Sequence, residues 1–297
     1  MKNEYKKIMK TDAEMITSAL ESFYEKGREK ELNLLIDAEK YSLMAGGKRI
    51  RPIILLAVCR MFGGNDKAAI PYAMAVEMIH TASLIHDDLP SIDNDELRRG
   101  KPTCHVAFGE ANALLAGDGL LMDAFGVVAS NPNVSSDIAQ NAVIALSRAT
   151  GTWGLVGGEF IDVYGEGRGF DLDTLKKMDA YKTGALIRVT AELGALAAGV
   201  SFEDERMKDV IKYAENIGVA FQIIDDILDT TATAEQLGKT PGKDAAVNKT
   251  TYLSFYSVEQ AQKIAENLTC EAIERIEKYN GSDFLIDLAR YLTERKN

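Results

Sequence analysis

Hydrophobic positions recur along this chain with the spacing of an amphipathic α-helix. Leu32, Leu35, Ile36 and Leu43, for example, follow the period of one helical face before Gly46-Gly47 interrupts it. No run of β-branched and aromatic residues alternates strictly with polar ones, as a half-buried strand would require. The pattern therefore predicts a chain built almost wholly of helices.

Prolines and glycines divide this helical pattern into segments. Pro52 suits the first turn of a helix that runs to Met61 and is closed by Gly63-Gly64. Pro71 is expected to open the next helix, over 72–88. Further helices are predicted at 136–163, 172–199, 204–230 and 257–295. No stretch has the composition of a linker, so residues 1–297 are predicted to form a single domain.

The net charge of the chain disfavours some classes of partner, and the spacing of its cysteines disfavours some kinds of site. The net charge is −11, which disfavours nucleic acid and anionic membrane surfaces as partners. An acidic protein still binds an acidic substrate when divalent cations lie between the two. Cys59, Cys104 and Cys270 are scattered without a CxxC spacing, which argues against a zinc site and a disulfide framework.

The apolar stretches of the sequence do not lead us to predict a membrane span. The most apolar long stretch, 185–200, is too short and is interrupted by Arg188 and Glu192. The first 15 residues contain no apolar segment that would indicate a signal peptide. We therefore expect no integral membrane segment and a cytoplasmic location.

Two clusters of aspartates follow apolar stretches, where an unpaired carboxylate is costly. In the later cluster, Asp225 and Asp229 share one helical face, Gln222 lies one turn earlier, and Asp226 is rotated by about 100°. A carboxylate beside a core needs a cation, a proton or a partner. This cluster is either a solvated helix end or one wall of a site for hard cations, which prefer oxygen ligands.

The earlier cluster begins with Asp87-Asp88 at a predicted helix end. Pro90 removes a backbone donor and ends or bends the helix, so that Asp93 can fold back toward Asp87. A calcium-binding EF-hand is excluded because Arg98 is the sixth residue counted from Asp93, where that loop requires glycine.

Zinc is disfavoured near the earlier cluster, although all three histidines of the chain lie there. His80, His86 and His105 do not have the HExxH spacing of a zinc site. His80 and Leu84 share a helical face that points toward Asp87 and Asp88. His86 and His105 are expected to be core or capping residues.

Basic residues accompany both clusters. Lys48 and Arg51 flank Arg49 in the turn before Pro52, where they can bind an anion beside a helix N-terminus. A P-loop is excluded because Arg49 replaces the serine or threonine that follows the lysine. The basic turn and Arg98-Arg99 are each, taken alone, more typical of a solvated surface. Beside the aspartates they favour a diphosphate site.

Two further lysines have alternative interpretations. Lys182, followed by Thr183, lies mid-helix in an apolar stretch, where its ammonium either reaches solvent or serves an anion. Lys239 lies in a glycine-bearing segment, 237–244, directly after the later aspartate cluster. That segment is either a mobile lid that closes on phosphate or a flexible surface loop.

Five motifs follow one another at family-like spacing: GGKRIRP (46–52), IHDDLPSIDNDELRRGKPTCH (85–105), KTGALI (182–187), FQIIDDILD (221–229) and LGKTPGKD (237–244). In that order they resemble the trans-isoprenyl diphosphate synthases, the polyprenyl synthetase family. The similarity is greatest to the bacterial farnesyl/geranylgeranyl diphosphate synthase type. The resemblance implies an all-α fold of the isoprenoid synthase type, a large helical bundle around a central cavity, usually in a homodimer.

The resemblance also implies a role for each matching residue. Asp87, Asp93 and Asp225 would ligate Mg²⁺, three ions in all when substrate is bound, with Asp88, Asp226 and Asp229 as outer or occasional ligands. Arg98 and Lys239 would hold the allylic diphosphate. Isopentenyl diphosphate would be held by Gly47, Lys48, Arg51, His80 and Arg99. Lys182, Thr183 and Gln222 would lie near the developing allylic cation, which their dipoles would favour.

The implied reaction is a head-to-tail condensation of isopentenyl diphosphate with a dimethylallyl, geranyl or farnesyl diphosphate. In this family the fifth residue before the first aspartate can form the floor of the elongation pocket. Here that residue is Ala82, about 7.5 Å along the helix from Asp87. A small floor residue favours geranylgeranyl over farnesyl diphosphate as the all-trans product.

Two rival functions differ in which motifs they retain. A terpene cyclase shares the first aspartate motif but usually lacks the GGKRxRP turn and the second cluster, both of which this chain has. A non-catalytic subunit of a heteromeric synthase tends to lose aspartates or arginines from these motifs. Consumption of isopentenyl diphosphate by the chain alone separates both rivals from a synthase.

Overall fold

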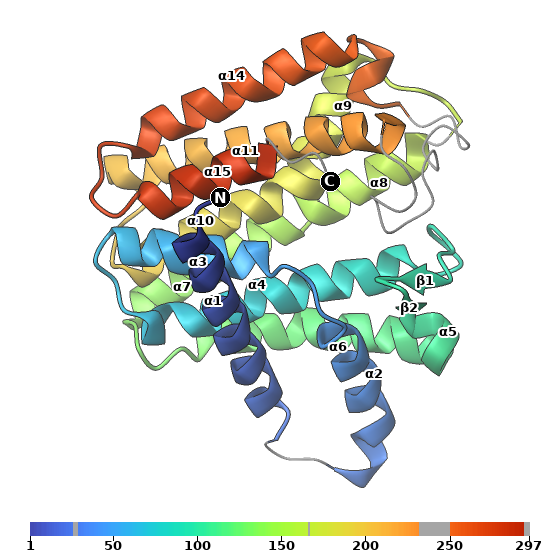
Figure 1. The fold of residues 1–297 in the computed structure, drawn as a ribbon. Helices are drawn as coiled ribbons and strands as arrows, with labels where there is room; N and C mark the ends of the chain where they lie inside the picture. Colours follow the sequence, from blue (N-terminus) through green and yellow to red (C-terminus); the bar gives the residue numbers. More distant parts are fainter. Residues whose placement is uncertain (26–28, 166, 232–249, 294–297) are drawn as a thin grey trace.

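The computed structural model describes residues 1–25, 29–165, 167–231 and 250–293, and within them the predicted all-helical fold is confirmed (Figure 1). The longer helices are α1 (Asn3–Phe23), α2 (Asn33–Leu43), α3 (Ile50–Met61), α4 (Asp66–Asp87), α6 (Glu110–Ala129), α7 (Ser136–Thr150), α8 (Leu155–Gly165), α9 (Leu172–Asp179), α10 (Ala185–Ala197), α11 (Glu205–Thr231), α14 (Val258–Ile276) and α15 (Asp283–Thr293). The short elements are α5 (Cys104–Phe108), η1 (Lys30–Leu32), η2 (Ala180–Gly184), η3 (Tyr252–Ser254) and the strands β1 (Leu97–Arg98) and β2 (Lys101–Pro102).

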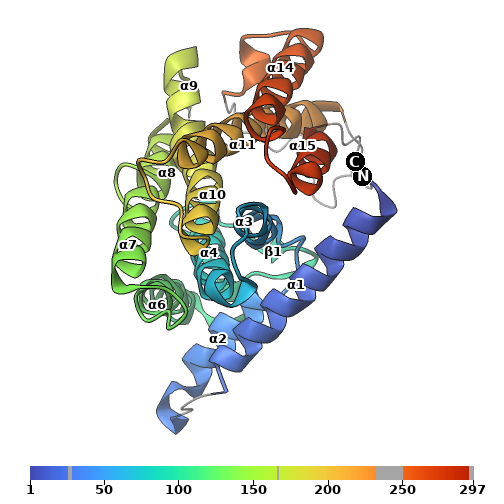
Figure 2. The ribbon, with the colours of Figure 1, turned by 90° about the vertical axis from the view of Figure 1, so that its left-hand side faces the viewer.

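Three helices form the middle of the bundle. Figure 2 shows α3, α4 and α10 surrounded by α1, α6, α7, α8, α11 and α15. In α10, eleven of thirteen residues are buried, and ten of these eleven are uncharged. Gly194 lets α10 approach α3 closely, because a Cβ at this position would lie 2.5 Å from the Leu55 carbonyl oxygen.

Several predicted boundaries were wrong. Pro71 does not open a helix but lies inside α4, which begins earlier because the Asn65 side chain accepts a hydrogen bond from the Lys67 N–H at the helix start. The helix expected over 136–163 is two helices, interrupted between Thr150 and Leu155. The one expected over 257–295 breaks near Gly281, whose φ of +85° favours glycine.

Two features were not predicted. The stretch rich in small residues around 111–119 belongs to a long helix, α6. The strands β1 and β2 form a tight hairpin, with Leu97 opposite Pro102 and Arg98 opposite Lys101. Its two turn residues, Arg99 and Gly100, have φ of 53° and 74°, the left-handed geometry of a two-residue hairpin turn. The hairpin sets the positions of Arg98 and Arg99, which follow the earlier aspartate cluster.

Two described helices, α4 and α6, are long and apolar enough to cross a membrane by length and composition alone. The apolar window of α4 is 72% buried in the bundle, as in a core helix, and that of α6 is 33% buried. This finding is weak evidence for a span. The expected lack of a membrane segment stays a prediction.

Candidate active site

The first aspartate cluster folds back on itself at the end of α4. The helix ends at Asp87, and the Asp93 N–H donates a 2.8 Å hydrogen bond to the Asp87 carbonyl oxygen. Asn94 follows with a left-handed φ of 50°. This is the return that Pro90 predicted, and it brings two of the expected metal ligands to one turn of backbone.

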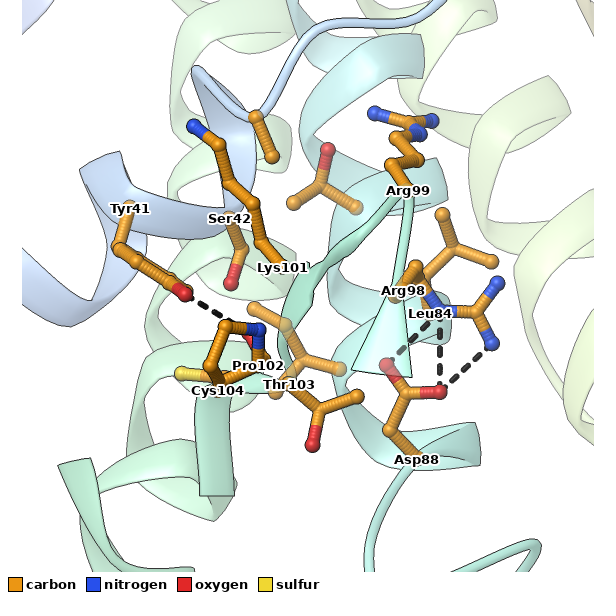
Figure 3. Close-up of a pocket in the computed structure, with 13 residues that line it drawn as sticks. Tyr41, Ser42, Leu84, Asp88, Arg98, Arg99, Lys101, Pro102, Thr103 and Cys104 are labelled. Carbon is orange, nitrogen blue, oxygen red and sulfur yellow. Dashed lines mark hydrogen bonds and ion pairs between the residues drawn. The ribbon is translucent and has the colours of Figure 1, made fainter. Parts of the chain in front are cut away.

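Asp88 and Arg98 bind each other tightly. The Arg98 guanidinium donates hydrogen bonds of 2.6 to 2.9 Å to the Asp88 carboxylate, which is 3% exposed. Figure 3 shows this pair, with the Arg99 guanidinium directed away from Asp88. Burial raises the pKa of Asp88, and Arg98 opposes that shift. The pair therefore fixes the hairpin against the end of α4.

Asp87 lies in a corner with an excess of negative charge. Burial, then the charge of Glu159 and more weakly that of Asp93, raise the pKa of Asp87 to about 7, while Lys182 acts in the opposite direction. One Glu159 carboxylate oxygen is buried without a hydrogen-bond partner in the described part of the chain. Carboxylates crowded in this way suit a bound cation, because a like charge disfavours ionisation of its neighbour.

The turn between α2 and α3 carries the basic residues of the first motif. Gly46, Gly47 and Arg49 all have positive φ, and the Arg99 guanidinium donates to the Gly46 carbonyl oxygen. Lys48 is exposed, with its ammonium 5.9 Å from the centre of the Tyr291 ring. The turn and the hairpin thus hold Arg99 between them.

Arg51 connects this turn to α4 and to α11. Its guanidinium lies 3.4 Å from His80 Nε2. Burial, followed by the charges of nearby arginines, lowers the pKa of His80 well below its ordinary value, so the imidazole is neutral at pH 7. Burial lowers the pKa of Arg51, whereas Glu77 and Asp225 raise it. Asp225 on α11 therefore lies within electrostatic reach of the basic turn.

The aspartates of α11 differ in burial, and the grouping differs from the one that the helical spacing predicted. Asp225 is half-buried, whereas Asp226 and Asp229 are buried. The Asp226 carboxylate accepts hydrogen bonds from the Gln222 amide (3.2 Å) and from the Tyr252 N–H (2.8 Å). Asp226 is thus held by its own helix and by η3.

Lys182, Thr183 and Gln222 come together around one small cavity of about 90 Å³ that is lined by α8, α9, η2 and α11. The Thr183 hydroxyl lies 3.5 Å from the Gln222 amide oxygen. Lys182 pairs with Glu159 at 2.6 Å and with Asp162 at 2.7 Å. Burial would lower the pKa of Lys182, but these carboxylates outweigh it and raise the pKa. Two carboxylates therefore neutralise the lysine charge beside the cavity.

Comparison with known proteins agrees with this geometry. Residues 33–282 match the polyprenyl synthetase family. The chain belongs to the polyprenyl synthetase family. It is 48% identical to a geranylgeranyl diphosphate synthase from Cyanophora paradoxa, over 89% of this chain and 88% of that one. It is 43% identical to the large subunit 1 of a heterodimeric geranylgeranyl pyrophosphate synthase, chloroplastic, from Arabidopsis thaliana, over 97% and 78%.

A solved structure supports the fold. The crystal structure of an FPP/GFPP synthase from Zymomonas mobilis superimposes with a TM-score of 0.87, at 34% identity, over 98% of this chain and 99% of that one. The expected family and the isoprenoid synthase fold are therefore confirmed. The chain is a prenyltransferase of this family.

Two acidic residues beside Lys182 were not predicted from the sequence. Glu159 and Asp162 lie three residues apart on α8, which places both on one helical face. They follow Gly157-Gly158, and a Cβ at Gly158 would clash with the Lys182 backbone nitrogen. The sequence did contain a signal for these two residues: a pair of glycines, which permits a close helix approach, directly precedes two acidic residues at helical spacing.

Ala82 lies on α4, one turn from His86, whose ring contacts α6 at the Leu114 carbonyl oxygen (3.1 Å). The side chains of Ala82, Met78 and Ile79 are 2%, 0% and 0% exposed. Within the part of the chain that the structure describes, Met78 and Ile79 therefore adjoin no water-sized space, and Ala82 adjoins almost none. A prenyl chain that passed Ala82 would have to displace a neighbour, and the flexible Met78 is suited to such a shift.

The metal ligands expected in this family come from opposite walls of the site. Among the described residues, no three carboxylate, histidine or cysteine side chains gather closely enough to hold an ion by themselves. The carboxyl oxygens of Asp87, Asp93 and Asp225 nevertheless have the chemistry that Mg²⁺ prefers. Lys239, expected to hold the allylic diphosphate, lies outside the described residues.

Proposed function

We propose that this chain is a Mg²⁺-dependent geranylgeranyl diphosphate synthase. The observation that carries the proposal is the position of Arg51. It contacts His80 on α4 and lies within reach of the charge of Asp225 on α11. An anion-binding group therefore lies beside α4, the helix that ends at the first aspartate cluster, and within reach of the charge of the second cluster. A reaction of two diphosphate substrates requires such a group.

In the proposed reaction, each group of residues has a separate task. Mg²⁺ held by Asp87, Asp93 and Asp225 would neutralise the allylic diphosphate and so promote its departure. Arg51 and neutral His80 would bind isopentenyl diphosphate, together with exposed Lys48. The double bond of isopentenyl diphosphate attacks the allylic carbon, and the proton then lost passes to the departing diphosphate.

The cavity beside Lys182 would stabilise the allylic cation. The Thr183 hydroxyl and the Gln222 amide offer dipoles there, and such dipoles act strongly where water is excluded. The ammonium of Lys182 does not repel the cation strongly, because Glu159 and Asp162 both pair with it. Lys182, Thr183 and Gln222 would therefore favour ionisation of the allylic diphosphate without forming a covalent bond to the substrate.

Two observations favour the geranylgeranyl product. Ala82 offers little bulk at the expected floor of the pocket, and the Cyanophora relative is named a geranylgeranyl diphosphate synthase. The purified chain should be incubated with Mg²⁺, isopentenyl diphosphate and dimethylallyl diphosphate, and its products identified by mass spectrometry. Geranylgeranyl diphosphate is the expected main product. Farnesyl diphosphate as the sole product would overturn this specificity.

We also propose that the chain acts as a homodimer. Large apolar side chains are exposed on three adjacent elements, α6, α7 and α8, and on the turn before α8: Leu114, Leu115, Met122, Ile144, Trp153, Val156, Phe160 and Tyr164. Trp153 is 75% exposed and Met122 65%. Contiguous apolar surface of this kind marks a protein interface, and a second copy would cover it.

A further inference from the structure

We propose that the buried ion pair between Arg49 and Glu77 positions the basic turn, residues 46–51, for isopentenyl diphosphate. This inference rests on the proposed function of the site. Arg49 and Glu77 would touch neither substrate nor metal. They would act through Lys48 and Arg51, the residues of the turn that meet the diphosphate.

The pair joins three elements of the fold. The Arg49 guanidinium donates a 2.5 Å hydrogen bond to the Glu77 carboxylate on α4, and both side chains are only 3% exposed. Its second terminal nitrogen donates a 2.5 Å hydrogen bond to the Leu43 carbonyl oxygen, at the end of α2. Arg49 thereby ties the end of α2 and the start of α3 to the middle of α4.

The backbone of Arg49 also needs an external hold. Its φ of 49° and ψ of 35° are left-handed, a conformation that residues other than glycine seldom adopt. Such a conformation persists where the surroundings over-determine it. Because Arg49 lies between Lys48 and Arg51, its dihedral angles set the directions in which both neighbours leave the turn.

Glu77 also compensates the charge of the turn. It is the carboxylate that raises the pKa of both Arg51 and Arg99, against burial that lowers them. Glu77 lies three residues before His80 on α4, hence on the same helical face. One carboxylate thus holds Arg49 directly and reduces the repulsion among three arginines next to the proposed substrate site.

A positioning role differs from a merely structural one in what a variant loses. A structural pair would affect stability and leave the affinity of the folded enzyme for both substrates intact. A positioning pair would weaken isopentenyl diphosphate selectively, because Lys48 and Arg51 serve that substrate. The KM for the allylic diphosphate would stay near its original value, since the first aspartate cluster binds that substrate.

The test uses Glu77→Gln, which keeps the size of the side chain and removes its charge. We expect the KM for isopentenyl diphosphate to rise between roughly tenfold and a hundredfold, as a small misplacement of binding groups produces. The KM for farnesyl diphosphate should change less than twofold. The matched control is Asp12→Asn, which breaks the pair of the buried Asp12 with the partly exposed Arg60 (2.8 Å) between α1 and α3. It should lower the melting temperature and leave both KM values unchanged.

A second variant separates stability from position. Replacement of the pair by Arg49→Met with Glu77→Leu should recover the melting temperature, because apolar substitutes for a buried ion pair are often neutral or stabilising. The KM for isopentenyl diphosphate should stay raised. An unchanged KM in Glu77→Gln, or a KM that recovers with stability in the double variant, would overturn the inference. A wild-type chain that consumes no isopentenyl diphosphate would instead overturn the proposed function.

Discussion

Substitution of Ala82 by tyrosine should shorten the product by one isoprene unit. One turn of α4 rises about 5.4 Å. One isoprene unit adds four chain bonds of about 1.5 Å, or roughly 5 Å when extended in a zigzag. Moving the floor of the pocket by one helical turn therefore corresponds to one unit. The introduced tyrosine would place its ring at the level that the last unit of a geranylgeranyl chain must pass.

The substitution also has a cost to the fold. Ala82 is 2% exposed, and inserting extra methylenes into a well-packed core already costs about 1–3 kcal/mol, so a tyrosine ring at this position should destabilise the fold by more. The product distribution reports only on molecules that turn over, so partial unfolding does not change it. Ala82→Ser is the matched control, because it adds a single oxygen and should leave the product unchanged.

The assay measures the ratio of farnesyl to geranylgeranyl diphosphate by mass spectrometry, with dimethylallyl diphosphate as starter. Ala82→Tyr should give mainly farnesyl diphosphate. In the opposite direction, Met78→Ala, one turn deeper on α4, should release some longer product. If Ala82→Tyr kept the wild-type ratio, the prenyl chain would not run past Ala82, and the reasoning from helix rise would be refuted.

Three further predictions concern the metal site, pH and the exposed apolar face. Asp87→Asn should lower kcat by at least about a hundredfold, because it removes a carboxylate that would hold the Mg²⁺ that neutralises the departing diphosphate; a near-normal steady-state rate would exclude this ligand. Burial, and to a smaller extent the charge of Asp123, raise the pKa of Glu39 to about 7. Because the unfolded chain then loses this proton at a lower pH than the folded chain, the free energy of unfolding should fall as pH rises from about 4.5 to 7 and stay low above pH 7. Glu39→Gln should then stabilise the fold at pH 8 by on the order of 1–3 kcal/mol and by much less near pH 4.5, as thermal unfolding at both values would reveal. Met122→Asp should convert a dimer to monomers in light scattering, and a wild-type chain that is already monomeric would refute the homodimer.

The sequence predicted what local spacing determines. The helical period and the Gly46-Gly47 break both depend on residues a few positions apart, and the fold agrees with each. Pro90 likewise predicted the return of Asp93 toward Asp87, because a proline ends a helix by its own covalent structure.

The ion pairs that the sequence did not predict depend on contacts between segments that are distant in the chain. The pairing of Lys182 with Asp162 joins α8 to η2, and that of Arg49 with Glu77 spans 28 positions in the chain. The local spacing of residues in the sequence predicts neither of these two ion pairs. The start of α4 was wrong for a different reason: the Asn65 cap begins the helix at Asp66, and Pro71 lies inside it as the sixth residue.

The central claim is that two aspartate walls and a basic turn make one metal-dependent diphosphate site. The most direct test measures consumption of isopentenyl diphosphate by the purified chain alone, with farnesyl diphosphate present, in Mg²⁺ and then in excess EDTA. The account predicts consumption in Mg²⁺, loss of it in EDTA, and recovery when Mg²⁺ is restored. Consumption that persists in EDTA, or none in Mg²⁺, would contradict it.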